Sequence, residues 1–362
     1  MSHSTAPALL SQLPQMDCAW LNAALHAGGF PEADVASFAI RPIGAGNVSD
    51  TVRVELAYRS HGPAPSSIIC KFSSSHPDNH AHGVGSGSYY REVNSYEILK
   101  ATADCCCIPR PFWVAGGPDN INLVMEDLSE DTRAGDQIAG CGPDDAASVI
   151  VELAKLHRAF FPMAREDAPV WGMTMADTAD YWVAAIERAL PVIREHVSGR
   201  LTPEEMATVE EARVMAPSWY RLPVLHGTLT HGDPRVDNIL FRDGKDGVQA
   251  ILIDWQMTGW RNPMHDVGYF LSGSVSVDDR RAHERALLSL YAKTLGDERE
   301  YGLEMISEDY RLQLLSGLMT TIASYGVLPL NAVTDRLMFT LLRRNVAAAM
   351  DWESLSSISK GG

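Results

Sequence analysis

Residues 229–260 decide the fold of this chain: they read LTHGDPRVDNILF, then the polar turn RDGKDG, then VQAILIDWQMTGW. A His-Gly pair precedes Asp233, Asn238 follows five residues after Asp233, and Asp254 closes the apolar run 251–253. Transfer of a γ-phosphoryl group needs a carboxylate beside the attacking hydroxyl and Mg²⁺ bound by hard oxygen ligands. The residue types and their order therefore predict phosphoryl-transfer chemistry.

The separation of Asp233 and Asn238 matches the kinase catalytic loop H-x-D-x-x-x-x-N, in which the Asp serves the substrate hydroxyl and the Asn turns back to a metal. We assign Asp233 as the catalytic carboxylate, and Asn238 and Asp254 as metal ligands. The turn at residues 244–247 predicts a hairpin that brings Asn238 and Asp254 to neighbouring strand ends. Taken singly, such residues are usually caps or turn residues, but their combination and spacing favour the catalytic interpretation.

The composition is that of a globular protein. The 362 residues suffice for one large domain or two lobes, and 46% of them are hydrophobic. The formal net charge of -16 argues against nucleic acid or an anionic membrane as a partner, because phosphate groups are bound by an excess of Lys and Arg. No apolar run reaches the roughly 18 to 20 residues of a membrane helix, and the first residues lack a signal-peptide pattern, so we expect a cytoplasmic protein.

The early part of the chain predicts a small antiparallel sheet around a glycine-containing turn. Residues 36–43 and 51–57 have strand patterns, and a short turn connects them. Glycine lets the main chain approach an anion closely, so Gly44, Gly46 and Ser49 are candidate phosphate contacts. An ordinary hairpin turn is the alternative, because the sequence lacks the full G-x-G-x-x-G of protein kinases.

Lys71 stands among apolar residues in the expected strand 67–72, where its charge needs a partner. The predicted helix 89–99 carries Glu92 near its start. Glu92 can pair with Lys71 and leave the ammonium aimed at the α- and β-phosphates of a nucleotide. Glu97 lies farther along the helix and is the rival partner, which we expect to be solvated.

Residues 73–88, SSSHPDNHAHGVGSGS, separate that strand from that helix. The segment is polar and rich in Gly, Ser and His, so we expect a mobile loop near the nucleotide or substrate. Its His76, His80 and His82 are candidate metal ligands, with solvated loop histidines as the favoured interpretation.

A lobe boundary is expected near Leu128. The apolar strand 121–125 runs into residues 126–129, and free backbone groups in such a connection can hydrogen-bond an adenine, which makes Glu126 and Leu128 candidate nucleotide contacts. Helical patterns then follow over 144–161, 179–197, from Thr202 with a capping box, 279–295, 307–323 and 334–352. The expected fold class is α+β, with a small N-terminal antiparallel-sheet lobe (1–128) and a larger, mainly helical C-terminal lobe (129–362).

Two further polar residues are expected to be structural. His157 lies on a broad apolar helix face, where a hydrogen-bonded core histidine is favoured over a catalytic one. Asp266 comes at a helix start, and a carboxylate there most often accepts backbone N–H bonds, although it is also a candidate third metal ligand. We expect Asp266 to brace the catalytic loop.

With these motifs, the chain resembles the aminoglycoside phosphotransferase and choline kinase superfamily, which shares the two-lobed protein-kinase-like fold, and most closely its ecdysteroid-kinase-like branch. The similarity runs from about residue 43 to residue 270 and is most specific in 231–238 and 253–255. The resemblance implies a catalytic Asp233, Mg²⁺ bound by Asn238 and Asp254, nucleotide phosphates bound by Lys71, a Glu92 that orients Lys71, and a structural Asp266.

We therefore predict an enzyme, an ATP- and Mg²⁺-dependent O-phosphotransferase that phosphorylates a hydroxyl of a small molecule, with a neutral or apolar alcohol favoured. An aminoglycoside or choline kinase is an alternative, since the acidic balance also suits a cationic acceptor. A hydroxyacyl-CoA kinase is a further alternative that the resemblance implies, because related domains phosphorylate hydroxyacyl thioesters. An inactive nucleotide-binding scaffold is the rival from another class, and a protein kinase ranks last because Trp255-Gln256 follows Asp254. The aromatic residues that line an acceptor pocket or pack between helices are Trp171, Trp182, Trp219, Tyr220, Trp255 and Trp260.

Overall fold

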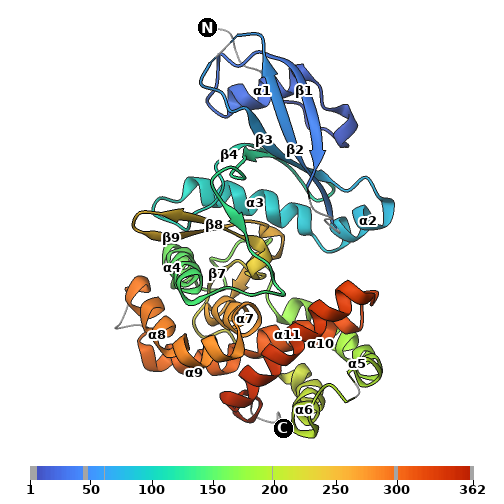
Figure 1. Ribbon diagram of the computed structural model, residues 1–362, viewed down its shortest axis with the longest axis vertical. Coiled ribbons are helices and arrows are strands. Elements are labelled where there is room, and N and C mark those ends of the chain that lie inside the picture. The colour runs from blue at the N-terminus through green and yellow to red at the C-terminus, as the bar shows by residue number, and fades with distance from the viewer. Residues whose placement is uncertain (1–5, 44–47, 61, 198, 297–300, 359–362) are drawn as a thin grey trace. The chain divides into compact units, whose positions relative to one another are not determined.

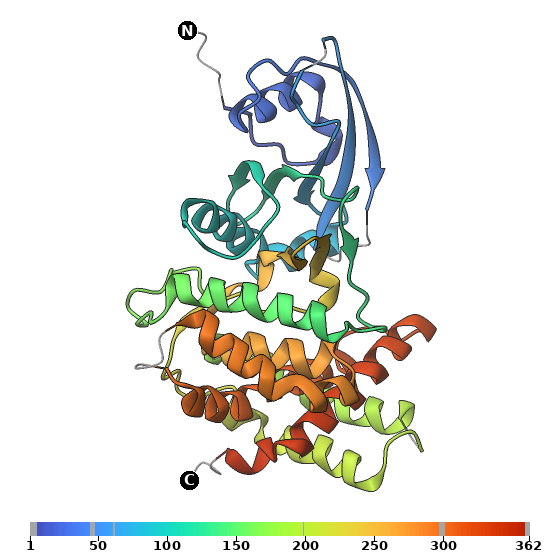
Figure 2. The same cartoon turned by 60° about the vertical axis from the view of Figure 1, so that its left-hand side comes forward.

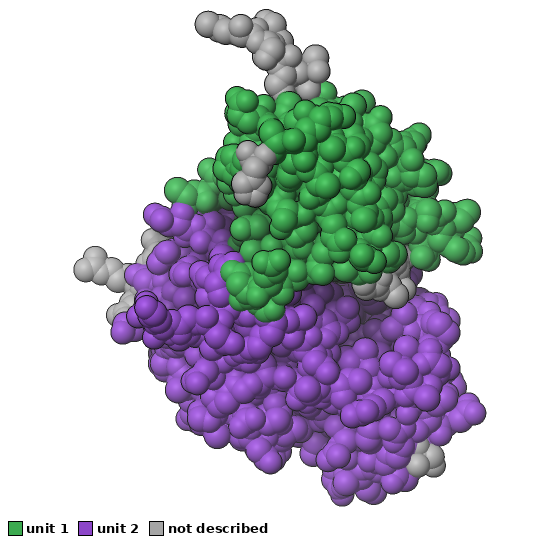
Figure 3. Space-filling model, turned by 45° about the horizontal axis from the view of Figure 1, so that its top comes forward, with its two compact units in different colours: residues 1–103, 108–132, 254–257 green, residues 104–107, 133–253, 258–362 purple. Residues whose placement is uncertain are grey.

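The computed structural model describes residues 6–43, 48–60, 62–197, 199–296 and 301–358. The chain forms two compact units, which Figure 3 colours separately. The first comprises Met1–Ala103, Ile108–Thr132 and Asp254–Met257, and the second comprises Asp104–Cys107, Arg133–Ile253 and Thr258–Gly362. The predicted site residues are thus divided: Lys71, Glu92 and Asp254 belong to the first unit, and Asp233 and Asn238 to the second.

The first unit is built on a five-stranded antiparallel sheet of order β1-β2-β3-β5-β4 (Figure 1). Its strands are β1 (Val35–Pro42), β2 (Ser49–Tyr58), β3 (Ser67–Ser73), β4 (Pro111–Gly116) and β5 (Ile121–Glu126). Lys71 lies on the central strand β3, in register with Thr51 of β2 and Leu123 of β5. Strand β3 has a neighbouring strand on each side, and this central position explains why Lys71 is buried.

Among the described residues of this unit, three α-helices accompany the sheet: α1 (Cys18–Ala27), α2 (Pro77–Gly85) and α3 (Ser88–Ala101). Helix α1 begins where the Asp17 side chain accepts a 2.7 Å hydrogen bond from the Trp20 amide. Helix α3 packs against β4 and β5 and against the short 3₁₀ turn Trp255–Met257. The core joins α1 to one sheet face through Trp20, Leu21, Leu25, Val54, Ile68, Cys70, Phe72 and Val124.

The mobile loop expected over residues 73–88 is wrong, because Pro77–Gly85 form helix α2. Pro77 opens the helix at its first position, where a missing N–H costs nothing. No apolar stripe reveals this helix in the sequence, because its residues are mostly polar or glycine. Packing on α3 replaces that stripe: a Cβ added at Gly83 would lie 2.5 Å from the Tyr89 ring, so only glycine fits.

Two small sheets occur in the described part of the second unit. Strands β6 (Arg133–Ala134), β8 (Ile239–Gly244) and β9 (Gly247–Leu252) form one, and β7 (Thr228–Thr230) pairs with β10 (Gly259–Arg261) in the other. The β8–β9 hairpin pairs Ile239 with Leu252 at the end away from its turn. Asn238 and Ile253 therefore leave the hairpin side by side.

Helices make up most of the second unit. They are α4 (Pro143–Phe160), α5 (Ala179–His196), α6 (Pro203–Trp219), α7 (Met264–Ser274), α8 (Val277–Leu295), α9 (Leu303–Gln313), α10 (Leu315–Tyr325) and α11 (Ala332–Asp351). Figure 2 shows α4, in green, alongside the orange α8. The expected capping box opens α6 through Thr202 and Glu205. Buried residues of α5, α6, α10 and α11 form the main core.

The single helix expected over 307–323 is wrong, because α9 and α10 meet at Leu314 instead. Gly268 of α7 approaches this junction so closely that an added Cβ would lie 2.8 Å from the Leu314 backbone. Leu314 itself keeps helical dihedral angles, φ -56° and ψ -24°, so the local sequence does not reveal the boundary between the two helices. Among the residues described, no helix has the length and apolarity needed to cross a membrane.

Candidate functional site

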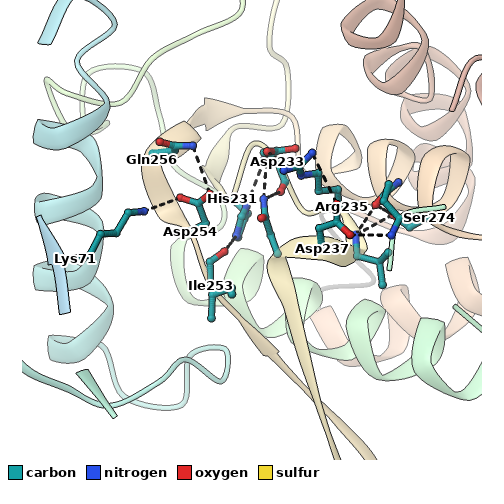
Figure 4. Close-up of polar contacts among 12 residues, drawn as sticks. Lys71, His231, Asp233, Arg235, Asp237, Ile253, Asp254, Gln256 and Ser274 are labelled. Atoms are coloured by element: carbon teal, nitrogen blue, oxygen red, sulfur yellow. Dashed lines mark hydrogen bonds and ion pairs between the residues drawn. The ribbon is translucent and has the colours of Figure 1, made fainter. Parts of the chain in front are cut away.

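In the first unit, the Lys71 ammonium contacts two carboxylates, those of Glu92 and Asp254. Its Nζ is 2.6 Å from Glu92 Oε1. The same Nζ is 3.0 Å from Asp254 Oδ1 (Figure 4). Burial alone would lower the pKa of Lys71, but Asp254 and Glu92 raise it, so the ammonium stays charged. Burial raises the pKa of Glu92, and the negative charge of Asp254 raises it further, although Lys71 acts in the opposite direction. Glu97, the rival partner, pairs instead with Lys100 on the exposed face of α3.

The backbone turns sharply at Asp254. Its φ is +66°, a left-handed conformation that few residues other than glycine adopt and that Asp tolerates. The Gln256 side-chain amide lies 3.4 Å from Asp254 Oδ2 (Figure 4). Arg91 of α3 donates from Nε to the Gln256 carbonyl oxygen at 2.8 Å. Helix α3 is therefore tied to the segment that presents Asp254, through a residue that the sequence analysis missed.

In the second unit, the loop before β8 presents Asp233. Gly232 has a φ of +87°, a conformation that favours glycine. The His231 and Gly232 amides donate to the Asp266 carboxylate at 2.6 and 2.9 Å. His231 Nδ1 accepts from the Asp233 amide at 3.3 Å, and Nε2 lies 3.0 Å from the Ile253 carbonyl oxygen (Figure 4), which assigns the proton to Nε2.

Asn238 contacts Asp233 directly. Its side-chain amide donates to the Asp233 carbonyl oxygen at 2.9 Å and to Asp233 Oδ2 at 3.2 Å. This use of the NH₂ group makes Asn238 Oδ1 the atom that can coordinate a metal. The Ile253 amide donates to the Asn238 carbonyl oxygen at 3.1 Å, so the residue before Asp254 in the chain is fixed to Asn238. Arg235 Nε lies 3.8 Å from Asp233 Oδ2.

Two neighbouring side chains secure the middle of this loop. The Val236 amide donates to Gln137 Oε1 at 2.9 Å and to Ser274 Oγ at 3.1 Å. The Gln137 backbone amide donates in turn to Asp237 Oδ1 at 2.7 Å. Gln137 and Ser274 lie 99 and 38 residues from Val236, so no local sequence pattern reveals them.

Asp266 and His157 form the buried support of the loop. Both are fully buried, and His157 Nε2 lies 3.2 Å from Asp266 Oδ2, while His157 Nδ1 lies 2.8 Å from the Tyr291 hydroxyl. Burial alone would raise the pKa of Asp266, but His157 lowers it to about 2, so the carboxylate is ionised and accepts the loop amides. These contacts are those of a supporting carboxylate.

The remaining predicted nucleotide contacts lie in the first unit. Gly44 and Gly46 are outside the described residues. Ser49 is buried at the start of β2, in register with Ser73. The Glu126 amide donates to the Arg110 carbonyl oxygen at 3.0 Å, so this N–H is not available to a base. The Leu128 carbonyl oxygen accepts from the Thr132 hydroxyl at 2.7 Å.

Most of the aromatic residues singled out in the sequence pack in cores. Trp219 and Tyr220 belong to the main core of the second unit, and Trp255 is fully buried. Trp260 is 8% exposed and donates from its indole to the Met163 carbonyl oxygen at 2.8 Å. Trp171 and Trp182 are partly exposed, so they are the two of this set that can still contact an acceptor.

A Lys–Glu pair on an antiparallel sheet unit, with an Asp–Asn loop on a helical unit, defines a kinase-like fold. Solved structures share this fold: the GDP complex of an aminoglycoside 2′-phosphotransferase-IIIa mutant is 14% identical, covers 90% of this chain and 96% of its own, and has a TM-score of 0.54. The choline kinase LicA from Streptococcus pneumoniae is 13% identical to this chain and has a TM-score of 0.50. The match covers 89% of this chain and 95% of the LicA chain. No curated protein matches the chain.

The model of the ecdysteroid kinase-like family matches residues 44–301. The chain belongs to this family. The match and the solved structures confirm the resemblance and the two-part α+β fold expected from the motifs around Lys71, Asp233 and Asp254.

Proposed function

We propose that this protein is an ATP- and Mg²⁺-dependent O-phosphotransferase that phosphorylates a hydroxyl group of a small molecule. Membership of the ecdysteroid kinase-like family and the kinase-like fold support this reaction class. The observation that carries the proposal is the buried ammonium of Lys71, bonded to both Glu92 and Asp254. A buried ammonium with two acidic partners is a costly arrangement for stability alone. Because the carboxylates outnumber the ammonium, the cluster suits a polyphosphate that arrives with a divalent cation, which Asp254 can bind while Lys71 faces the phosphates.

The chain's own residues have distinct roles in this proposal. Asp233 accepts or orients the proton of the acceptor hydroxyl, and Asn238 keeps the Asp233 carboxylate in one rotamer through its 3.2 Å contact. Lys71 binds the α- and β-phosphates, with Glu92 fixing its direction. Asn238 Oδ1 and the Asp254 carboxylate are hard oxygen donors that suit Mg²⁺. When bound, Mg²⁺ supplies positive charge that offsets the charge of the phosphates.

Nucleotide recognition also involves the first unit. Ser49 with Gly44 and Gly46 contacts phosphate, and the connection at Glu126 and Leu128 contacts adenine. Since the Glu126 amide is bonded to Arg110, the adenine contact falls to the other backbone groups of this connection, such as the Leu128 amide.

A neutral or apolar alcohol is the proposed acceptor. The ecdysteroid kinase-like family match supports it, because an ecdysteroid is a hydroxylated, uncharged molecule. The net charge of -16 would equally suit a cationic acceptor such as choline or an aminoglycoside, so these belong in the same test.

Magnesium-dependent ATP turnover by the purified chain tests the proposal across a panel of alcohols. The panel contains an ecdysteroid, other neutral sterols, choline, an aminoglycoside and a hydroxyacyl-CoA. We expect phosphorylation of a neutral member, seen as an acceptor-dependent rise in ADP and a mass increase of the acceptor. ATP binding without turnover on any member would favour the inactive scaffold.

A further inference from the structure

The Tyr89 hydroxyl joins two strand ends of the first unit. It donates to the Val48 carbonyl oxygen at 2.6 Å and accepts from the Ser74 amide at 3.1 Å. Val48 directly precedes strand β2, and Ser74 directly follows strand β3. One side-chain oxygen on α3 thus fixes the backbone at the start of β2 relative to the end of β3.

These strand ends carry the proposed phosphate contacts. Ser49 is the next residue after Val48, and Lys71 lies three residues before Ser74 on β3. Tyr89 also precedes Glu92 by three residues on α3, so the two side chains lie on neighbouring positions of one helix face. Helix α3 therefore contacts the phosphate side of the sheet twice, through Glu92 on Lys71 and through Tyr89 on Val48 and Ser74.

The surroundings of Tyr89 permit little movement. The residue is 1% exposed, and the His80 ring lies 5.7 Å from its ring, centroid to centroid. Helix α2 closes the remaining side, because Gly83 leaves no room for a Cβ beside the Tyr89 ring. Burial raises the pKa of Tyr89, so its hydroxyl keeps the proton that it donates to Val48.

We propose that Tyr89 is a positioning residue for the nucleotide: it fixes Ser49 and Lys71 in the arrangement that binds the phosphates. This inference rests on the proposed kinase function and extends it to a residue that contacts neither phosphate nor acceptor. It predicts that loss of the hydroxyl weakens nucleotide affinity, whereas a purely structural hydroxyl would only lower the stability of the fold.

Tyr89→Phe tests this inference, because it removes one oxygen and keeps the ring. Tyr58→Phe is the matched control: Tyr58 lies on the same sheet, and its hydroxyl donates to a backbone oxygen, that of Pro65, at 2.7 Å. Titration calorimetry with ADP and Mg²⁺ measures affinity in the full chain. Hydrogen exchange at the Ser74 amide measures the strand ends without any nucleotide.

We expect Tyr89→Phe to weaken ADP affinity by about 5- to 10-fold and to speed exchange at Ser74, since one bond to a buried amide and one to a carbonyl are lost. Tyr58→Phe should have a melting temperature similar to that of Tyr89→Phe and should keep the ADP affinity of the wild type. Gly83→Ala is a second variant, which displaces the Tyr89 ring without removing its hydroxyl, and it should weaken ADP binding in the same direction.

Equal ADP affinity in Tyr89→Phe and Tyr58→Phe would overturn the inference while leaving the kinase proposal intact. Failure of the wild-type chain to bind ADP or ATP would instead overturn the kinase proposal, whatever the exchange rate at Ser74. The two failures are therefore distinguishable.

Discussion

Lys71 and Glu92, which are 21 positions apart in sequence, form a buried ion pair of 2.6 Å between a central strand and helix α3. The side chains are 8% and 2% exposed, so neither charge is compensated by bulk water. Removing one partner leaves the other buried and uncompensated. Function and stability are therefore coupled at this pair, and variants must separate the two effects.

Lys71→Met should abolish turnover and also destabilise the fold. We expect at least about a 100-fold loss of ATP turnover, because the contact to the phosphates is lost. The free energy of unfolding should fall by about 3 kcal/mol, because Glu92 is then buried without a cation and faces the partly exposed Asp254 carboxylate. Denaturant unfolding and a turnover assay measure the two effects.

The double variant Lys71→Met with Glu92→Gln separates the effect on turnover from the effect on stability. It removes the uncompensated Glu92 charge, so we expect it to recover part of the stability and none of the turnover. Lys155→Met is the control, since Lys155 pairs with Glu152 at 2.8 Å in the second unit without a predicted role. Full turnover in the double variant would show that Lys71 does not serve the phosphates.

Arg91→Gln should weaken the response to Mg²⁺. Arg91 Nε is bonded to the Gln256 carbonyl oxygen at 2.8 Å, two residues after Asp254, so its loss frees the segment that presents a proposed metal ligand. We expect the Mg²⁺ concentration at half-maximal nucleotide binding to rise by about tenfold, as for residues that orient metal ligands elsewhere. A Mg²⁺ titration at fixed ADP gives this value.

Arg110→Gln is the matched control for Arg91→Gln. It removes a guanidinium bond of the same kind in the same unit, from Arg110 to the Gly28 carbonyl oxygen at 2.8 Å. The half-maximal Mg²⁺ concentration should not change in this variant. A similar rise in both variants would indicate a general loosening of the first unit and would remove Arg91 from the account.

Asp266→Asn should change how stability depends on pH. The folded pKa of Asp266 is lowered to about 2 from an ordinary value of 3.8, so the unfolded chain binds the proton more tightly. The stability that Asp266 contributes is therefore fully present above about pH 4 and is lost as the pH falls through about 2. The difference in free energy of unfolding between wild type and variant should shrink by about 2 kcal/mol over this window. Urea unfolding from pH 7 downward measures it, and a constant difference would contradict the assignment.

The sequence predicted the pairs that have a short spacing or a strong chemical requirement. Lys71 in an apolar strand required an acidic partner, and the helix that follows offered Glu92, which the structure confirms as the partner. Asp233 and Asn238 were linked by their spacing, and their 3.2 Å contact agrees with it. Their roles in catalysis and metal binding stay predictions, to be tested by the variants above.

Other features depend on tertiary contacts that no local pattern records. Helix α2 has no apolar stripe, and its Gly83 packs closely against Tyr89. The boundary between α9 and α10 lies at Leu314, where Gly268 of α7 comes close to the backbone. The bond from Arg91 to Gln256 joins residues 165 apart in sequence. The left-handed backbone at Asp254 could have been suspected, since Asp is among the residues that tolerate it, but its position follows from the surrounding structure.

The most direct test of the central claim is ATP turnover by Asp233→Asn, compared with Asp243→Asn on the exposed β8–β9 hairpin. The substitution keeps the shape of Asp233 and removes its charge, so we expect turnover to fall by about 10²- to 10⁴-fold while ADP binding is kept. Asp243→Asn should keep full turnover, since its side chain is 70% exposed. Wild-type turnover in Asp233→Asn would contradict the assignment of Asp233 as the catalytic carboxylate and, with it, the proposed reaction.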